Sequence, residues 1–243
     1  MKKELTFTKK DGKVIRGVVY LPDSLKEGEK CPTVIFSHGF GGNYRCLEHH
    51  GNGYAKAGIA CVFFDFCGGG LESLSDGSMK EMTVLTEADD LEAVFDQVRS
   101  LEFADPEKLY LQGESMGGFV SAYVAAKKKD LVKGLILWYP AFVIPDDSRV
   151  RYEKGDDTCF DVDISPDFNR AAMNIDVFAV IPAYKGPVKI IHGDRDEIVP
   201  LEYSVRAVKV YDNAELVVIN GAGHGYEGAD SDKARRLSID FIE

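Results

Sequence analysis

The stretch Leu109-Tyr-Leu-Gln-Gly-Glu-Ser-Met-Gly-Gly118 decides the fold of this 243-residue chain. Its first residues form a short apolar run, which is typical of a strand buried on both faces of a sheet. Residues 116–128 follow with a helical pattern. Between strand and helix lies Gly113-x-Ser115-x-Gly117, the pattern of a sharp turn that holds a serine hydroxyl above the sheet edge. The stretch therefore predicts an α/β protein with Ser115 as a nucleophile.

Buried strands and helices alternate on both sides of this turn. Apolar runs predict strands, and amphipathic patterns predict helices at about 44–57, 83–100, 202–211 and 230–242. The expected strands cover 33–36, 59–64, 109–111, 134–138, 187–191 and 215–219. This alternation indicates a mostly parallel twisted sheet with helices on both faces. Residues 5–8 and 14–21 flank Asp11-Gly12, which predicts an antiparallel hairpin at the edge.

We expect a single domain over residues 1–243, interrupted by an insertion at about 140–185. The insertion separates two strands by far more than an ordinary loop and holds nine acidic and five basic residues, a net charge of −4. Long insertions of this kind are usually functional, so we expect a lid over the carboxyl ends of the strands. The alternative is a helix with long loops and no role in binding.

Composition limits the partners and the compartment. With 40 acidic and 29 basic residues the formal charge is −11, which argues against nucleic acid and against anionic membranes. No run reaches the roughly 18 apolar residues of a membrane helix, and no apolar segment of a signal peptide follows the N-terminus. The five cysteines are scattered without a CxxC pair, which favours free thiols in the cytoplasm.

A serine nucleophile needs a histidine as its base, and the chain has five histidines. His224 lies in a glycine-rich loop between the last strand and the last helix, where it can approach Ser115, so we predict it as the base. His38 and His192 each end a strand and are expected to be structural. His49 and His50 fall in a predicted surface helix and are expected to be solvated.

The base needs a carboxylate that orients it, located between the serine and the histidine in the sequence. The segment His192-Gly-Asp-Arg-Asp-Glu197 offers Asp194, Asp196 and Glu197. Position alone does not decide among these three.

An oxyanion formed at Ser115 needs backbone donors. The Met116 N–H lies at the start of the predicted helix, and the turn Ser37-His-Gly-Phe-Gly-Gly42 offers Phe40 N–H as the second donor. Removing one such donor typically costs about 3 kcal/mol of transition-state stabilisation.

These motifs, from His38-Gly39 to Gly223-His224, together resemble the α/β-hydrolase superfamily. Within it, the chain is most similar to small bacterial cinnamoyl/feruloyl esterases, which are related to monoacylglycerol lipases. The resemblance implies no cofactor, an inserted lid after the sixth strand, and Asp196 as the acid of a Ser-His-Asp triad. No metal is expected, because the sequence has no metal-ligand spacing such as HExxH. One departure is Cys67-Gly68-Gly69-Gly70, where the family often has Asn-Gly-His-Gly or Arg-Gly-His-Gly.

The sequence thus predicts a cytoplasmic serine carboxylesterase for small or aromatic esters, including feruloyl esters. Its partner would be a small-molecule ester, and a homodimer is left open. The alternatives are a peptidase, a thioesterase, a monoacylglycerol lipase or a non-catalytic ligand-binding module. Cys67 is a weaker nucleophile candidate because no base lies beside it in the sequence.

Overall fold

Apolar runs build a central sheet of eight strands in the computed structural model, which describes residues 1–243. The strand order is β1-β2-β4-β3-β5-β6-β9-β10. The bounds are β1 Lys2–Thr8, β2 Val14–Tyr20, β3 Cys31–Ser37, β4 Ala60–Phe64, β5 Ala104–Glu114, β6 Gly134–Trp138, β9 Val188–Gly193 and β10 Ala214–Ile219. β1 and β2 pair antiparallel and β2 also pairs antiparallel with β4, whereas all other pairs are parallel. The predicted sheet and its edge hairpin are confirmed.

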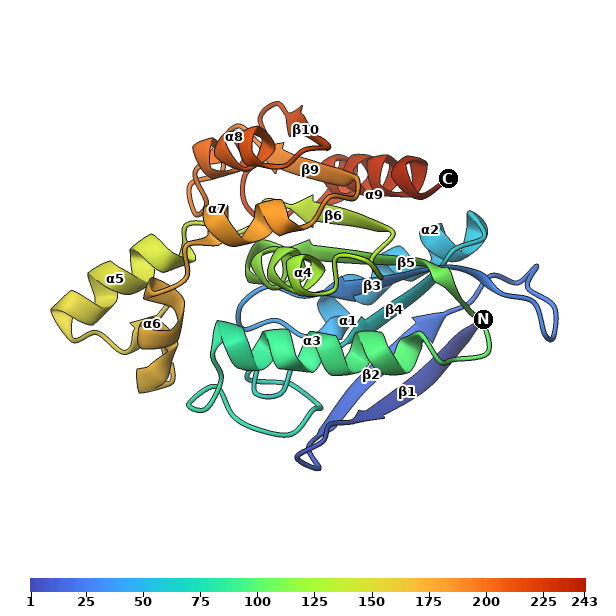
Figure 1. Ribbon diagram of the computed structural model, residues 1–243, viewed down its shortest axis with the longest axis horizontal. Helices are drawn as coiled ribbons and strands as arrows, with labels where there is room; N and C mark the ends of the chain where they lie inside the picture. The colour runs from blue at the N-terminus through green and yellow to red at the C-terminus, as the bar shows by residue number, and fades with distance from the viewer.

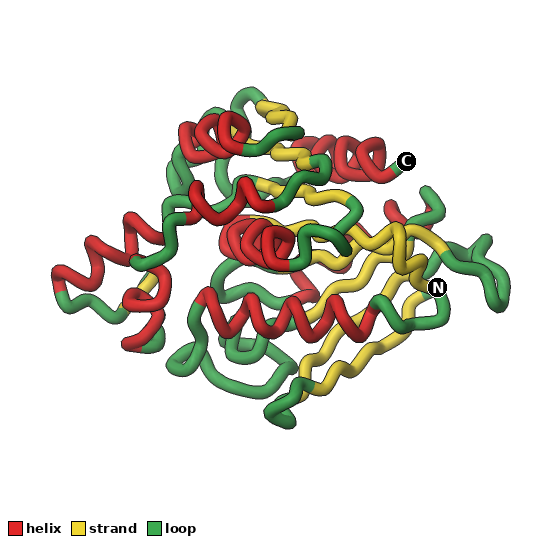
Figure 2. The backbone as a smooth tube through the Cα atoms, in the orientation of Figure 1, coloured by secondary structure: helices red, strands yellow, loops and turns green.

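Helices cover both faces of the sheet (Figures 1 and 2). Successive side chains of a strand point to opposite faces, so Ile35 belongs to one core whereas Val34 and Phe36 belong to the other. The core around Ile35 is covered by α3 (Val84–Val98), α4 (Ser115–Lys127) and α8 (Leu201–Val210). The opposite core is covered by α1 (Tyr44–Leu47), α2 (Gly51–Lys56) and α9 (Gly228–Ile242). None of the helices has the length and apolar character needed to cross a bilayer.

The predicted helix at 44–57 is broken, and the expectation for His50 was wrong. A 3₁₀ turn, η1 (Glu48–His50), separates α1 from α2 and directs His50 inward. Only 2% of His50 is exposed, and its ring packs edge-on against Trp138 at 5.1 Å. The chain can approach the sheet this closely because position 51 is a glycine. A Cβ there would lie only 2.4 Å from the Tyr20 ring. Burial lowers the pKa of His50 to about 3, whereas His49 is exposed as predicted.

The insertion after β6 contains three helices and a two-stranded hairpin before a final 3₁₀ turn. They are α5 (Ile144–Lys154), the hairpin of β7 (Thr158–Cys159) and β8 (Val162–Asp163), α6 (Pro166–Met173) and α7 (Val177–Val180), followed by η2 (Ile181–Ala183). α5 and α6 pack on each other and project from the sheet at the left of Figure 1. α7 and η2 instead pack against α4. The projecting pair of helices, α5 and α6, follows the carboxyl end of β6. Proteins with parallel sheets bind ligands at this edge of the sheet.

Glu87 on α3 is a fully buried carboxyl group without a hydrogen-bond partner on either oxygen. It lies beneath the glycine-rich loop after β4, because a Cβ at Gly69 would be 3.1 Å from its Oε1. Burial, together with the nearby Asp90, raises the pKa of Glu87 well above its usual value of 4.5. The folded protein therefore holds this side chain in its neutral form over a pH range in which the unfolded chain ionises it.

We expect Glu87→Gln to make the free energy of unfolding less dependent on pH. In the native chain stability falls as pH rises above 4.5, because only the unfolded state then releases the proton of Glu87. Each pH unit costs about 1.4 kcal/mol until the folded-state pKa is reached. Urea unfolding between pH 5 and pH 8 should show the stability gain of the variant growing with pH. A constant difference between variant and native chain would contradict this, and Asp89→Asn, exposed on the same helix, is the control.

Candidate active site

The turn from β5 into α4 places Ser115 at a sharp corner. Ser115 is the first residue of α4 and has a φ of +50°, a left-handed conformation that costs about 1–3 kcal/mol in a residue other than glycine. The flanking glycines are required by close backbone contacts, within the turn for Gly113 and with the end of β3 for Gly117. A Cβ at Gly113 would lie 2.2 Å from the Gly117 carbonyl oxygen, and a Cβ at Gly117 would lie 2.4 Å from the Ser37 and His38 carbonyl oxygens.

Two hydrogen bonds connect Ser115, His224 and Asp196. The Ser115 Oγ lies 3.0 Å from His224 Nε2, and His224 Nδ1 lies 2.8 Å from Asp196 Oδ2. Because a carboxylate can only accept, Nδ1 carries the proton, and Nε2 is left free to accept the serine proton. The structure thus brings together the three residues that the sequence and the family resemblance singled out.

The Asp196 carboxylate is fully buried and held by several donors. Its Oδ1 accepts from the backbone N–H groups of Ile198 at 2.9 Å and Val199 at 2.8 Å. Burial alone would raise its pKa, but hydrogen bonds from His192, His224 and Val199 N–H outweigh burial and hold the pKa well below the usual range. The group is therefore an anion at every pH at which the imidazole could act as a base.

The other acidic candidates of this segment have different partners. Asp194 Oδ1 accepts from Gly221 N–H at 2.6 Å and so ties down the loop that carries His224. Glu197 is exposed and lines the cavity beside Ser115. The hydrogen-bond partners therefore distinguish the three carboxylates, which their positions in the sequence did not do.

The loop after β3 lies directly against the serine. A Cβ at Gly39 would be 3.2 Å from Ser115 Cβ. His38 is buried and braces the loop: its Nδ1 lies 2.8 Å from the Gly39 carbonyl oxygen, and its Nε2 accepts from Phe66 N–H at 3.2 Å. The Phe40 N–H has no hydrogen-bond partner within the protein, and Phe40 and Met116 line the same cavity as Ser115. Both residues that are predicted to supply oxyanion donors therefore line the cavity at the serine.

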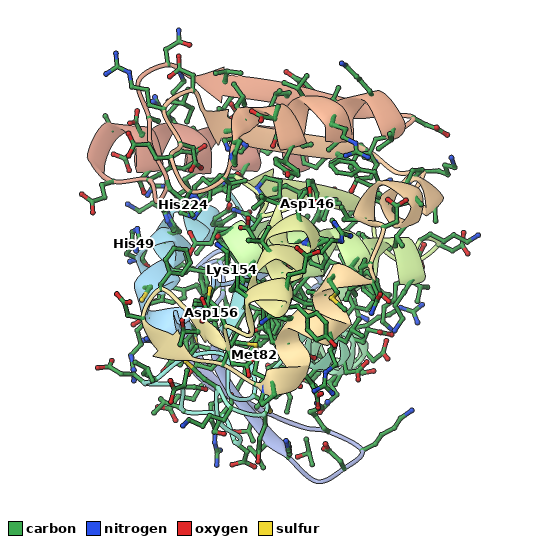
Figure 3. The ribbon with its side chains drawn as sticks, turned by 90° about the vertical axis from the view of Figure 1, so that its left-hand side faces the viewer. His49, Met82, Asp146, Lys154, Asp156 and His224 are labelled. Atoms are coloured by element: carbon green, nitrogen blue, oxygen red, sulfur yellow. The ribbon has the colours of Figure 1, made fainter.

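A cavity of about 490 Å³ opens at Ser115 and is walled by the insertion. Phe40, Phe160 and Phe168 supply apolar surface, and Asp147 and Arg151 of α5 supply charge. Figure 3 looks onto this side of the molecule and labels Asp146, Lys154 and Asp156 of the insertion together with His224. Sequence reasoning anticipated the insertion, but no periodicity indicated which of its side chains face the serine.

Two further residues at the site, Glu114 and Tyr139, were missed. The Tyr139 hydroxyl donates to Glu114 Oε2 at 2.6 Å, and the Tyr139 ring lies 4.6 Å from the His224 ring. Glu114 is the variable position before the motif serine, and Tyr139 follows β6. Their contact depends on the pairing of β5 with β6, which the sequence alone does not show.

Cys67 lies outside this constellation. The residue is buried, its N–H donates to Asp90 at 2.7 Å, and burial raises the pKa of its thiol to about 12. A thiol that remains protonated at ordinary pH is a poor nucleophile, which agrees with the low rank of Cys67 as a nucleophile candidate in the sequence. No group of three or more His, Cys, Asp or Glu side chains is arranged to hold a metal ion.

A mostly parallel eight-stranded sheet with a serine raised between a central strand and its helix defines an α/β hydrolase. Residues 28–154 match the Hydrolase_4 family, described as "Serine aminopeptidase, S33", and the chain belongs to this family. The fold and superfamily expected from the motifs are thereby confirmed.

Similar proteins support the same class. Est1E from Butyrivibrio proteoclasticus with ferulic acid bound has a TM-score of 0.87 and 29% identity, covering 98% of this chain and 99% of that chain. A second structure of Est1E has a TM-score of 0.83 and 27% identity, covering 98% of each chain. The AB hydrolase superfamily protein YisY of Bacillus subtilis (strain 168) is 25% identical over 251 residues, covering 86% of this chain and 90% of that protein.

Proposed function

We propose that the protein is a serine carboxylesterase for small or aromatic carboxylic esters. The observation that carries this proposal is the hydrogen-bonded chain from Ser115 through His224 to the buried Asp196, which opens onto a cavity of about 490 Å³. A neutral imidazole already accepting from a serine hydroxyl is the arrangement that nucleophilic acyl transfer needs.

In the proposed mechanism Ser115 Oγ attacks the ester carbonyl while His224 Nε2 takes its proton. Asp196 holds the imidazole tautomer and stabilises the imidazolium. The Phe40 and Met116 N–H groups bind the tetrahedral oxyanion, and His224 then protonates the departing alkoxide to leave an acyl-enzyme. Water repeats the sequence and releases the acid. Activity is expected to fall at low pH, because a protonated histidine cannot accept the serine proton.

The lining of the cavity supports an aromatic acyl group with a polar substituent. Its apolar wall suits a ring, and the Asp147 carboxylate in the same wall, which no side chain of the protein engages in a hydrogen bond or ion pair, can accept a hydrogen bond from a substrate hydroxyl. Arg151 is held by Asn169 and Ser148 at 3.0 and 3.1 Å. The similar protein Est1E has been solved with ferulic acid, a phenolic acid, bound. We therefore propose feruloyl-type esters within the substrate range and the insertion as the lid that selects them.

The direct test is a panel of nitrophenyl acetate, butyrate, octanoate and palmitate with methyl ferulate. We expect turnover of the short-chain and aromatic esters and its loss in Ser115→Ala, which removes the nucleophile but no backbone contact. Turnover that persists in this variant would contradict the serine mechanism. Monoacylglycerol and acyl-thioester substrates in the same panel separate the lipase and thioesterase alternatives. Ligand binding without any turnover would favour the binding module.

Asp147→Ala is expected to lower the preference for phenolic over plain aromatic esters. Losing one hydrogen bond to a charged acceptor should reduce the ratio of kcat/KM for methyl ferulate to that for methyl cinnamate about tenfold. Asp146→Ala is the matched control, because its carboxylate is engaged by Arg149 at 3.2 Å and Tyr203 at 2.7 Å. Equal ratios in the two variants would show that Asp147 does not contact the substituent.

A second candidate is an aminopeptidase that acts on short peptides. The family description favours it, and so do the carboxylates of Glu197 and Asp161 in the cavity wall, since an acidic wall suits an N-terminal ammonium. Alanine p-nitroanilide and its N-acetylated form distinguish the two candidates. Turnover that requires the free amine, and exceeds ester turnover in kcat/KM, would replace the esterase proposal.

We also propose that the enzyme works in the cytoplasm as a single domain with a small-molecule ester as its partner, with monomer and homodimer both open. All five cysteines are free thiols, which suits a reducing compartment. Cell fractionation tests the compartment, and gel filtration tests the oligomeric state.

A further inference from the structure

Glu114 joins the two loops that complete the active site. It is the last residue of β5 and precedes Ser115, yet its side chain does not cap α4. Its carboxylate accepts from the Tyr139 hydroxyl at 2.6 Å, and the Gly39 N–H of the oxyanion loop also favours its charged form. The Glu114 carboxylate thus lies between the loop that carries Gly39 and the Tyr139 side chain, which contacts His224.

Tyr139 carries this connection to the histidine loop. The centroid of its ring lies 4.6 Å from the ring centroids of both His224 and Tyr226. Only 2% of Tyr139 is exposed, and its φ is +34°. Such a conformation is unfavourable for a bulky residue and persists only where surrounding contacts enforce it.

The electrostatic surroundings of Glu114 agree with this placement. Burial raises the pKa of Glu114 above its usual value, and the Tyr139 hydroxyl, the Gly39 N–H and the positive forms of His224 and His49 offset only part of that rise. His224 itself contacts Asp196, Ser115 and Tyr139. In its ionised form, Glu114 adds to Asp196 a second negative charge beside the Tyr139 ring that contacts His224, and this charge stabilises the imidazolium.

We propose that Glu114 is a positioning residue that, through Tyr139 and Gly39, aligns the His224 imidazole with the oxyanion loop and adds a second negative charge near the base. The inference rests on the serine mechanism of the proposed function. Repulsion between Glu114 and the oxyanion opposes part of the gain at the imidazolium. The pH below which activity is lost is therefore a more specific measure of the effect of the Glu114 charge than the maximal rate is.

The test is the rate at which an alkyl fluorophosphonate labels Ser115 between pH 4.5 and pH 9. This probe measures activation of the nucleophile without requiring the natural ester. Glu114→Gln keeps the shape but removes the charge, and should slow labelling at the plateau about tenfold. The acid limit should move to lower pH by about half a unit or more, because the imidazolium loses a nearby negative charge. Glu114→Asp, which keeps the charge, should restore the acid limit.

Glu48→Gln is the matched control, since Glu48 is another carboxylate bonded to a tyrosine, Tyr20, at 3.1 Å. It should leave both the rate and the acid limit unchanged. A Glu114→Gln enzyme whose acid limit equals that of the native chain would overturn the inference, whatever its melting temperature. If this variant does not fold, Tyr139→Phe decides: labelling slowed severalfold supports the inference and an unchanged rate overturns it. A native chain that the probe does not label would instead overturn the proposed function itself.

Discussion

Asparagine in place of Asp196 should lower kcat about ten-thousand-fold while the chain remains folded. The carboxylate accepts the Nδ1 proton of His224 at 2.8 Å, whereas an amide can present an N–H there and force the proton onto Nε2. The imidazole would then face Ser115 with a donor and could not accept the serine proton. Steady-state kinetics on nitrophenyl butyrate, with the melting temperature measured in parallel, checks this expectation.

The matched control is Asp194→Asn, the same substitution two residues away. Asp194 accepts from Gly221 N–H at 2.6 Å, a bond that an amide oxygen can also make. We expect its kcat to remain within about threefold of the native value. If Asp194→Asn abolished activity and Asp196→Asn did not, the acid of the triad would have been assigned to the wrong residue.

Alanine at Gly113 should destabilise the fold by about 3 kcal/mol or more and abolish activity. The added Cβ would lie 2.2 Å from the Gly117 carbonyl oxygen and 2.4 Å from its carbonyl carbon. Backbone rather than a flexible side chain blocks the space, so the turn must open and carry Ser115 away from His224. Urea unfolding monitored by the single tryptophan, Trp138, measures the loss of stability.

Gly223→Ala is the comparison for this prediction, because Gly223 precedes His224 but has room for a methyl group. The nearest atom to its Cβ would be the Arg195 carbonyl oxygen at 3.6 Å, an ordinary contact distance. We expect a change of less than about 0.5 kcal/mol in the free energy of unfolding. Equal losses in the two variants would show that the turn at Ser115 has no special requirement for glycine.

The sequence was sufficient for the fold because buried runs, breakers and the serine motif all indicate the same alternation of strands and helices. The meeting of Ser115 with His224 was accessible because motifs at strand ends meet at one edge of a parallel sheet, whereas Asp196 was chosen over Asp194 and Glu197 only through the family resemblance. His50 was not accessible, since it becomes buried only through a 3₁₀ turn that interrupts an otherwise helical pattern. The contact of Glu114 with Tyr139 depends on strand register and on a strained φ, and neither leaves a local signal.

The strand order has a consequence for how the enzyme would lose activity. The nucleophile follows β5 near the middle of the sheet, whereas His224 follows β10, which is an edge strand. Sheet edges open locally at a smaller free-energy cost than the centre. Detachment of β10 would withdraw the base while the serine turn and the main core stay intact. Inactivation by urea should therefore occur at a lower urea concentration than global unfolding. The rate of amide hydrogen exchange in β10 should then measure the stability of the catalytic site against local opening, rather than the stability of the whole fold.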